Sequence, residues 1–186
     1  LLPLLARARF SVLHMHRPKL FLLRAAVNSV GMFCGFTALT MIPLAQMTAL
    51  SFTTPLFVTI GAVLFLGEVI KARRVAAIGI GFLGTLIILQ PGVVDVTSGS
   101  LLALVHALTI ATASLIVKVL TRSDSQHAIV TWMVVMQTPL ALIPSLWVWQ
   151  WPDLLTWGFL WGMALSGTIA HLSLIHISEP TRLGFI

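Results

Sequence analysis

Long apolar runs alternate with short polar connections along most of the chain. The hydrocarbon core of a bilayer is about 30 Å thick, so a helix rising about 1.5 Å per residue crosses it in about 20 residues. Apolar runs near this length, each bounded by charged or helix-breaking residues, predict six membrane-spanning helices. Their ranges are 25–42, 45–66, 75–89, 100–120, 128–149 and 154–172. The pattern therefore predicts an all-α fold, a polytopic transmembrane helix bundle.

The composition excludes the class of soluble globular proteins. Of the 186 residues, 58% are apolar and 9% are charged, whereas a soluble domain carries about 25% charged residues. So few charges cannot cover a surface that faces water. Cys34 is the single cysteine, which excludes an internal disulfide framework and a cysteine-rich metal site.

The basic residues that precede the C-terminal tail all fall on one side of the predicted bundle. The alternate connections, around Pro43, Asp95 and Asp153, contain no lysine or arginine. The positive-inside bias identifies the basic side as cytoplasmic. This topology accounts for the net charge of +6, so the sequence does not favour nucleic acid as a partner. The basic residues are Arg7, Arg9, Arg17, Lys19, Arg24, Lys71, Arg73, Arg74, Lys118 and Arg122.

The two ends of the chain carry separate expectations. An apolar stretch over residues 1–5 comes before Arg7 and Arg9, the reverse of the order in a signal peptide. We expect residues 1–24 to be the end of a truncated transmembrane helix followed by a basic cytoplasmic loop. Residues 173–186 break a hydrophobic run and resemble translated sequencing-adapter read-through. We expect this tail to be non-native, and an amphiphilic cytoplasmic tail is the alternative.

The second predicted span is the most polar one. Pro55 has no N–H, and its ring displaces the carbonyl of Ser51 four residues earlier. One interpretation is a proline kink whose hydroxyl side chains are bonded back to their own helix. The other is the wall of a polar cavity near the midplane, as in the broken helices of transporters. On that interpretation Gln46, Ser51, Thr54 and Pro55 are candidate substrate-binding residues.

Other polar residues lie within or next to the spans. Asn28 and Gln137 are uncharged hydrogen-bonding groups, and His106 is the strongly titratable side chain well inside a span. His106 is either an interhelix hydrogen-bonding residue or a proton carrier for coupled transport. Glu68 lies three residues before Lys71, so it forms either a local interfacial ion pair or part of a gate.

Small residues recur at four-residue spacing, for example Gly31 and Gly35. This spacing places them on one helix face and allows a neighbouring backbone to approach closely. Tight packing within the chain is one interpretation, and a homodimer contact is the other.

Several of these features together resemble the EamA repeat of the drug/metabolite transporter superfamily. The resemblance implies ten helices in two inverted five-helix repeats, with 25–92 as the remainder of the first repeat and 93–172 as the start of the second. It also implies that the candidate residues named above line a central cavity. The matching stretches, in order, are residues 24–31, 38–45, 54–58 (TPLFV), 65–68 (FLGE) and 79–91.

The resemblance implies a secondary transporter that moves a small metabolite or drug across the bacterial inner membrane by alternating access. Its expected partners are the lipid bilayer and a small solute, with no nucleic acid. A non-transporting scaffold or partner subunit is the alternative, followed by a membrane-embedded enzyme. The sequence contains no catalytic, metal-binding or cofactor motif that would support an enzyme.

Overall fold

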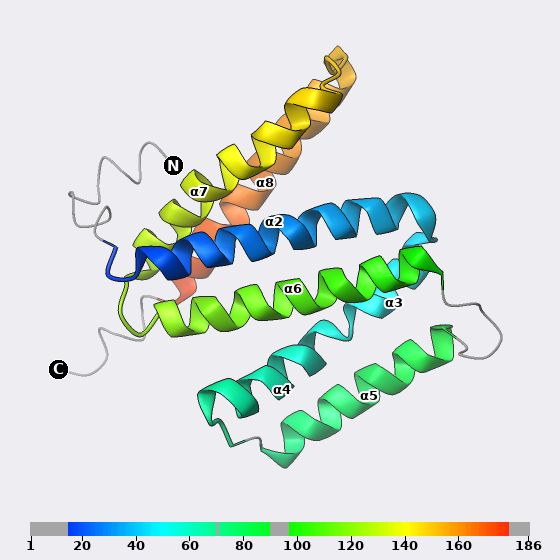
Figure 1. Ribbon diagram of the computed structural model, residues 1–186, viewed down its shortest axis with the longest axis vertical. Helices are drawn as coiled ribbons and strands as arrows, with labels where there is room; N and C mark the ends of the chain where they lie inside the picture. Colours follow the sequence, from blue (N-terminus) through cyan, green and yellow to red (C-terminus); the bar gives the residue numbers. More distant parts are fainter. Residues whose placement is uncertain (1–14, 70, 90–96, 179–186) are drawn as a thin grey trace. The chain divides into compact units, whose positions relative to one another are not determined.

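The computed structural model describes residues 15–69, 71–89 and 97–178, and these residues form helices with no strand among them (Figure 1). The predicted all-α fold is confirmed. The expectations for the helix end at residues 1–5 and for residues 179–186 of the tail lie outside the described residues. The helices are α2 (Pro18–Met41), α3 (Leu44–Ser51), α4 (Thr54–Leu66), α5 (Ala72–Leu89), α6 (Ser98–Leu120), α7 (Gln126–Ser145) and α8 (Leu154–Ser178).

Helix length and composition identify four candidate spans among the described residues. These are Pro18–Met41, Leu44–Leu66, Ser98–Leu120 and Ala128–Ser145. Val75–Ile87 and Leu154–Gly167 are shorter apolar helices. All six predicted runs are therefore helical, and four of them have both the length and the apolar composition of a membrane span within the described residues.

Two helix ends differ from the prediction. α2 begins at Pro18 rather than at residue 25, because proline suits the first turn of a helix and the charges after it do not stop the helix. Arg24, placed by the sequence in the cytoplasmic loop, is therefore inside α2. α7 ends at Ser145 rather than at residue 149, and a 3-10 turn, Leu146–Val148, follows it.

The chain divides into two compact units, Leu1–Leu142 and Ile143–Ile186. In the second unit, Trp149 and Trp151 form an edge-to-face pair with ring centroids 5.8 Å apart. The Asp153 carboxylate accepts a hydrogen bond of 2.9 Å from the Thr156 backbone N–H. This bond satisfies one of the free N–H groups in the first turn of α8.

In the first unit, α6 packs against α2 and against the successive helices α3 and α4 (Figure 1). Phe21, near the start of α2, shares a buried cluster with Leu120 at the end of α6. Ala38 and Ile42, at the other end of α2, pack in a second cluster with Ala103 near the start of α6. α2 and α6 therefore run antiparallel. Their basic termini consequently lie together, in agreement with the predicted sidedness of the charges.

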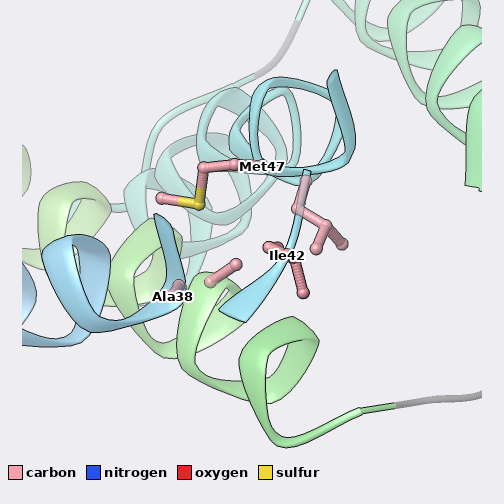
Figure 2. Packing of buried hydrophobic residues seen from close by; sticks show 5 residues of the cluster. Ala38, Ile42 and Met47 are labelled. Atoms are coloured by element: carbon pink, nitrogen blue, oxygen red, sulfur yellow. The ribbon is translucent and has the colours of Figure 1, made fainter. Parts of the chain in front are cut away.

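The second cluster also includes Met47 and Leu50 of α3 (Figure 2). Ile42 ends α2 in an extended conformation, and Pro43 immediately precedes α3. The short connection turns the chain sharply, so Met47 reaches the side chains of Ala38 and Ile42. The turn thus places the start of the second apolar run beside α6.

Glycine residues determine how closely α2 approaches α6. The ring Nδ1 of His106 donates a hydrogen bond of 2.7 Å to the Gly31 carbonyl. A Cβ atom at Gly35 would lie 2.6 Å from this same nitrogen, and a Cβ at Gly31 would overlap the Thr109 hydroxyl. The small-residue face of α2 therefore packs tightly within the chain, and His106 forms an interhelix hydrogen bond.

The loop after α6 is fastened to the chain that precedes α2. Asp124 has a side chain with 0% exposure, and one carboxylate oxygen accepts the His16 backbone N–H at 3.0 Å. The His16 ring lies 3.2 Å from the same oxygen, and the Ser123 hydroxyl donates to the other oxygen at 2.7 Å. Burial acts to raise the pKa of Asp124, but these hydrogen bonds and the charge of His16 outweigh it and hold the pKa below its usual value.

The Gly35 contact predicts a difference between two otherwise identical substitutions. Gly35→Ala should lower the free energy of unfolding by about 1–3 kcal/mol, because the new methyl group overlaps the His106 ring. Gly79→Ala in α5 meets nothing within 4 Å and should be neutral or stabilising. Thermal unfolding of the purified protein in detergent measures both changes. Equal stability of the two variants would contradict the close approach of α2 and α6.

The Asp124 site predicts a loss of stability in acid. The folded-state pKa lies below the unfolded-state value of about 3.9, so the carboxylate stabilises the fold above that value. This stabilisation is lost as the pH falls through the lower folded-state pKa. Thermal unfolding between about pH 7 and pH 3 should therefore show a smaller acid-induced loss for Asp124→Asn than for the wild type. Parallel pH profiles would argue against the role of this carboxylate.

Candidate functional site

The second apolar run is interrupted between α3 and α4. α3 ends at Ser51 and α4 begins at Thr54, with Pro55 in its first turn. Between them the Phe52 N–H donates to the Ala49 carbonyl at 3.1 Å, and the Thr53 N–H donates to the Leu50 carbonyl at 3.0 Å. These i-to-i−3 bonds replace the α-helical pattern. Pro55 thus lies at a break that divides the run into two helices. The sequence alone allowed either a kinked helix or a broken one.

Thr85 of α5 reaches the break from a neighbouring helix. Its hydroxyl lies 3.1 Å from the Ala49 carbonyl and 3.1 Å from the Gly81 carbonyl. Only 2% of Thr85 is exposed, so this hydroxyl is a buried partner for the interrupted backbone. The sequence analysis did not select Thr85. The available signal was that Thr85 is the one hydrogen-bonding side chain in residues 75–89.

The candidate residues of the second run have different surroundings. The Ser51 hydroxyl donates to the Met47 carbonyl of its own helix at 2.9 Å, which fits the interpretation of back-bonded hydroxyls. The Gln46 amide reaches α6 and donates to the Ser100 hydroxyl at 3.0 Å. Thr54 is half-buried and Pro55 is exposed.

Asn28 and Gln137 are brought together although 109 residues separate them. The Asn28 side-chain amide donates to the Gln137 carbonyl oxygen at 3.2 Å. The Gln137 amide in turn donates to the Ser29 hydroxyl at 2.9 Å, and that hydroxyl donates to the Ala25 carbonyl at 2.9 Å. An uncharged polar network therefore connects α2 to α7.

An ion pair joins the ends of α4 and α6. Gly67 ends α4 in the left-handed conformation with φ 65°, which glycine adopts without strain. Glu68 follows and pairs with Lys118 in the last turn of α6. The sequence suggested a local ion pair or part of a gate for Glu68, and the structure shows an ion pair with Lys118 on a helix distant in sequence.

Some buried polar atoms have no hydrogen-bond partner within the described part of the chain. They are Arg24 Nε in α2, Thr59 Oγ1 in α4 and Trp132 Nε1 in α7. Arg24 is 7% exposed, so its position corrects the prediction that it belongs to the cytoplasmic loop. A buried cation without a counter-charge costs considerable free energy, which makes Arg24 a functional candidate.

The arrangement suits recognition by hydrogen bonds. Hydrogen bonds join Asn28 to Gln137, Gln46 to Ser100 and His106 to Gly31, in three separate places. Among residues 15–69, 71–89 and 97–178, no group of three histidine, cysteine, aspartate or glutamate residues is placed to hold a metal ion.

Comparison with known proteins supports the resemblance seen in the sequence. Residues 1–90 match the EamA-like transporter family. The chain is 36% identical over 139 residues to a riboflavin transporter of Rhizobium johnstonii, which covers 75% of this chain and 46% of the relative. It is also 36% identical over 152 residues to a riboflavin transporter of Vibrio cholerae, covering 81% of this chain and 51% of the relative.

A more distant relative is an S-adenosylmethionine uptake transporter of Rickettsia prowazekii. The two proteins are 26% identical over 168 residues, which covers 90% of this chain and 57% of the relative. The chain thus spans about half the length of these relatives. No solved structure matches the chain. The apolar helices, the family match and the transporter relatives agree: the chain is a multi-pass membrane protein, and over residues 1–90 it matches the EamA-like transporter family.

Proposed function

We propose that the chain forms part of a secondary transporter that moves a small metabolite across the bacterial inner membrane by alternating access, and that it is not an enzyme. The observation that carries this proposal is the break between α3 and α4. A helix interrupted inside an apolar run leaves backbone groups that are tolerated only where protein or a water-filled cavity surrounds them. In transporters such breaks lie at the solute site.

The proposed cavity is lined by the candidate residues on both sides of the bundle. The polar side chains of α2 and α7 supply one part and those of the broken run, with α6, supply the other. The residues are Asn28, Gln46, Ser51, Thr54, Pro55, His106 and Gln137. Proton coupling through His106 and a homodimer contact stay predictions.

We further propose that residues 25–92 and 93–172 belong to two inverted repeats. On this division the antiparallel contact of α2 with α6 lies between the two repeats, because α2 comes from the first repeat and α6 from the second. Rocking of one repeat against the other would then act across the Gly31–His106 contact. The Glu68–Lys118 ion pair also joins the two proposed repeats.

The relatives suggest which solute to test first. The relatives of higher identity are named riboflavin transporters and the more distant one is named an S-adenosylmethionine uptake transporter. Both solutes are heterocyclic metabolites with many hydrogen-bonding groups. We therefore propose riboflavin as the first solute and S-adenosylmethionine as the second.

Uptake by proteoliposomes that contain the full protein tests the transport proposal. The wild type should accumulate labelled riboflavin or S-adenosylmethionine, and Gln46→Ala and Thr54→Ala should each reduce uptake by about tenfold. This is the effect of losing one hydrogen bond of about 1.4 kcal/mol. Thr112→Ala is the matched control, because the Thr112 hydroxyl is bonded to its own helix. A non-transporting scaffold would show no uptake of either solute by the wild type, and that outcome would contradict the proposal.

The buried Thr85 hydroxyl gives a second prediction about the break. Thr85→Val should lower the free energy of unfolding by about 1–2 kcal/mol, because the buried Ala49 carbonyl loses a donor while the side-chain shape is kept. It should also reduce solute uptake, since the hydrogen bond between the end of α3 and Thr85 of α5 is lost. Thr85→Ser keeps the hydroxyl and should retain more uptake. Wild-type stability and uptake in Thr85→Val would show that this bond does not position the break.

A further inference from the structure

Arg24 occupies an unusual position for a cation in a span. It lies in the second turn of α2, within the candidate span Pro18–Met41. Its neighbours Leu22 and Leu23 are 57% and 50% exposed, whereas Arg24 is 7% exposed. The guanidinium group is therefore on the protein side of α2 and not on its outer face. The leucines, by contrast, occupy the face where lipid would lie.

Trp132 of α7 lies at the same level as Arg24. Phe21 and Ile129 belong to one buried cluster near the starts of α2 and α7. About two turns further on, Asn28 is hydrogen-bonded to Gln137. These two connections show that α2 and α7 run in the same direction over this stretch.

Arg24 follows Phe21 by three positions, and Trp132 follows Ile129 by three positions. Residues three apart lie on one face of a helix, one turn further along. Arg24 and Trp132 therefore both lie between the buried cluster and the Asn28–Gln137 bond. Trp132 packs against that cluster, and its indole nitrogen is buried.

Both side chains place a buried nitrogen that can only donate a hydrogen bond. Guanidinium and indole N–H groups donate and cannot accept, so neither can satisfy the other. Arg24 Nε and Trp132 Nε1 have no hydrogen-bond partner among the described residues. Two buried donors at one level, one of them part of a cation, suit an acceptor that carries negative charge.

The carboxylates in the described parts of the chain are engaged elsewhere. Glu68 pairs with Lys118, and Asp124 accepts hydrogen bonds from His16 and Ser123. Asp153 belongs to the other compact unit, where it caps α8. None of these contacts supplies a counter-charge to Arg24.

We propose that Arg24 and Trp132 form a binding site for an anionic oxygen group, a carboxylate or a phosphate, on the transported solute. This inference rests on the proposed transport function and narrows its solute to one that carries an anionic group, such as S-adenosylmethionine or a phosphate ester of riboflavin, rather than riboflavin itself. Arg24 supplies charge and hydrogen bonds, and the Trp132 indole N–H supplies one further donor. The amide network of Asn28 and Gln137 lies about one turn away and is placed to contact an uncharged part of the same solute.

A pair of flavins that differ by one phosphate group tests the site. Binding of riboflavin and riboflavin 5′-phosphate to the full protein is measured by equilibrium dialysis in discs of zwitterionic lipid, with S-adenosylmethionine as a carboxylate-bearing probe. The wild type should bind the phosphate ester at least about tenfold more tightly than riboflavin. Arg24→Gln should abolish this preference and weaken S-adenosylmethionine binding by about tenfold, whereas riboflavin binding should change little.

Three further variants keep the test decisive if Arg24→Gln does not fold. Arg24→Lys should retain part of the preference, because the charge remains while the planar donor array is lost. Trp132→Phe should reduce the preference by about threefold, through the loss of one donor. Arg17→Gln removes an exposed charge that precedes the same helix and should leave the preference unchanged.

Several outcomes would overturn the inference. The first is equal binding of the two flavins by the wild type, together with S-adenosylmethionine binding that does not change in Arg24→Gln. The second is a preference for the phosphate ester that survives in Arg24→Gln. The third is a loss of that preference in Arg17→Gln as large as the loss in Arg24→Gln. A preference that is present only with anionic lipid would assign Arg24 to lipid headgroups and would also overturn it. If the protein takes up riboflavin but Arg24→Gln does not change the binding of any anionic probe, the transport proposal stands and this site is rejected. Absence of both uptake and binding would reject the transport proposal as well.

Discussion

The close approach of α2 and α6 is the contact around which the first unit is organised. Lipid offers no hydrophobic driving force for helix association, so packing and hydrogen bonds must hold the helices together. Gly31 and Gly35 leave room for the His106 ring, and that ring donates to the Gly31 carbonyl. The two buried clusters lie at opposite ends of this pair, and α3 reaches one of them through Met47.

This contact also determines which distant residues meet. Because α2 and α6 are antiparallel, the start of α2 lies beside the end of α6 and the loop that follows it. Asp124 can then accept hydrogen bonds from His16 although 108 residues separate them. α7 begins from the same end, which brings Gln137 to Asn28. The polar network between α2 and α7 thus depends on the pairing of α2 with α6, although its hydrogen bonds do not involve α6.

The helices of this fold were predictable because each apolar run has nearly the length of a membrane span and is bounded by charged or helix-breaking residues. The start of α2 was not predicted, since Arg24 was interpreted as a loop residue although its side chain is buried in the bundle. Partners were harder to predict than elements. Gly31 and Gly35 indicated a close neighbour, but nothing local identified His106 as that neighbour. Thr85 was missed because its importance depends on the Ala49 carbonyl, whose partner in an unbroken helix would be the Thr53 N–H.

The break between α3 and α4 has an electrostatic consequence. Each α-helix carries about half a positive charge at its N-terminus and about half a negative charge at its C-terminus. The negative end of α3 and the positive end of α4 meet within a few residues, between Leu50 and Thr54. Seen from a distance these opposite partial charges cancel, whereas a group close to them experiences a steep local field. The chain can therefore create strong polarity inside an apolar layer without placing a net charge there.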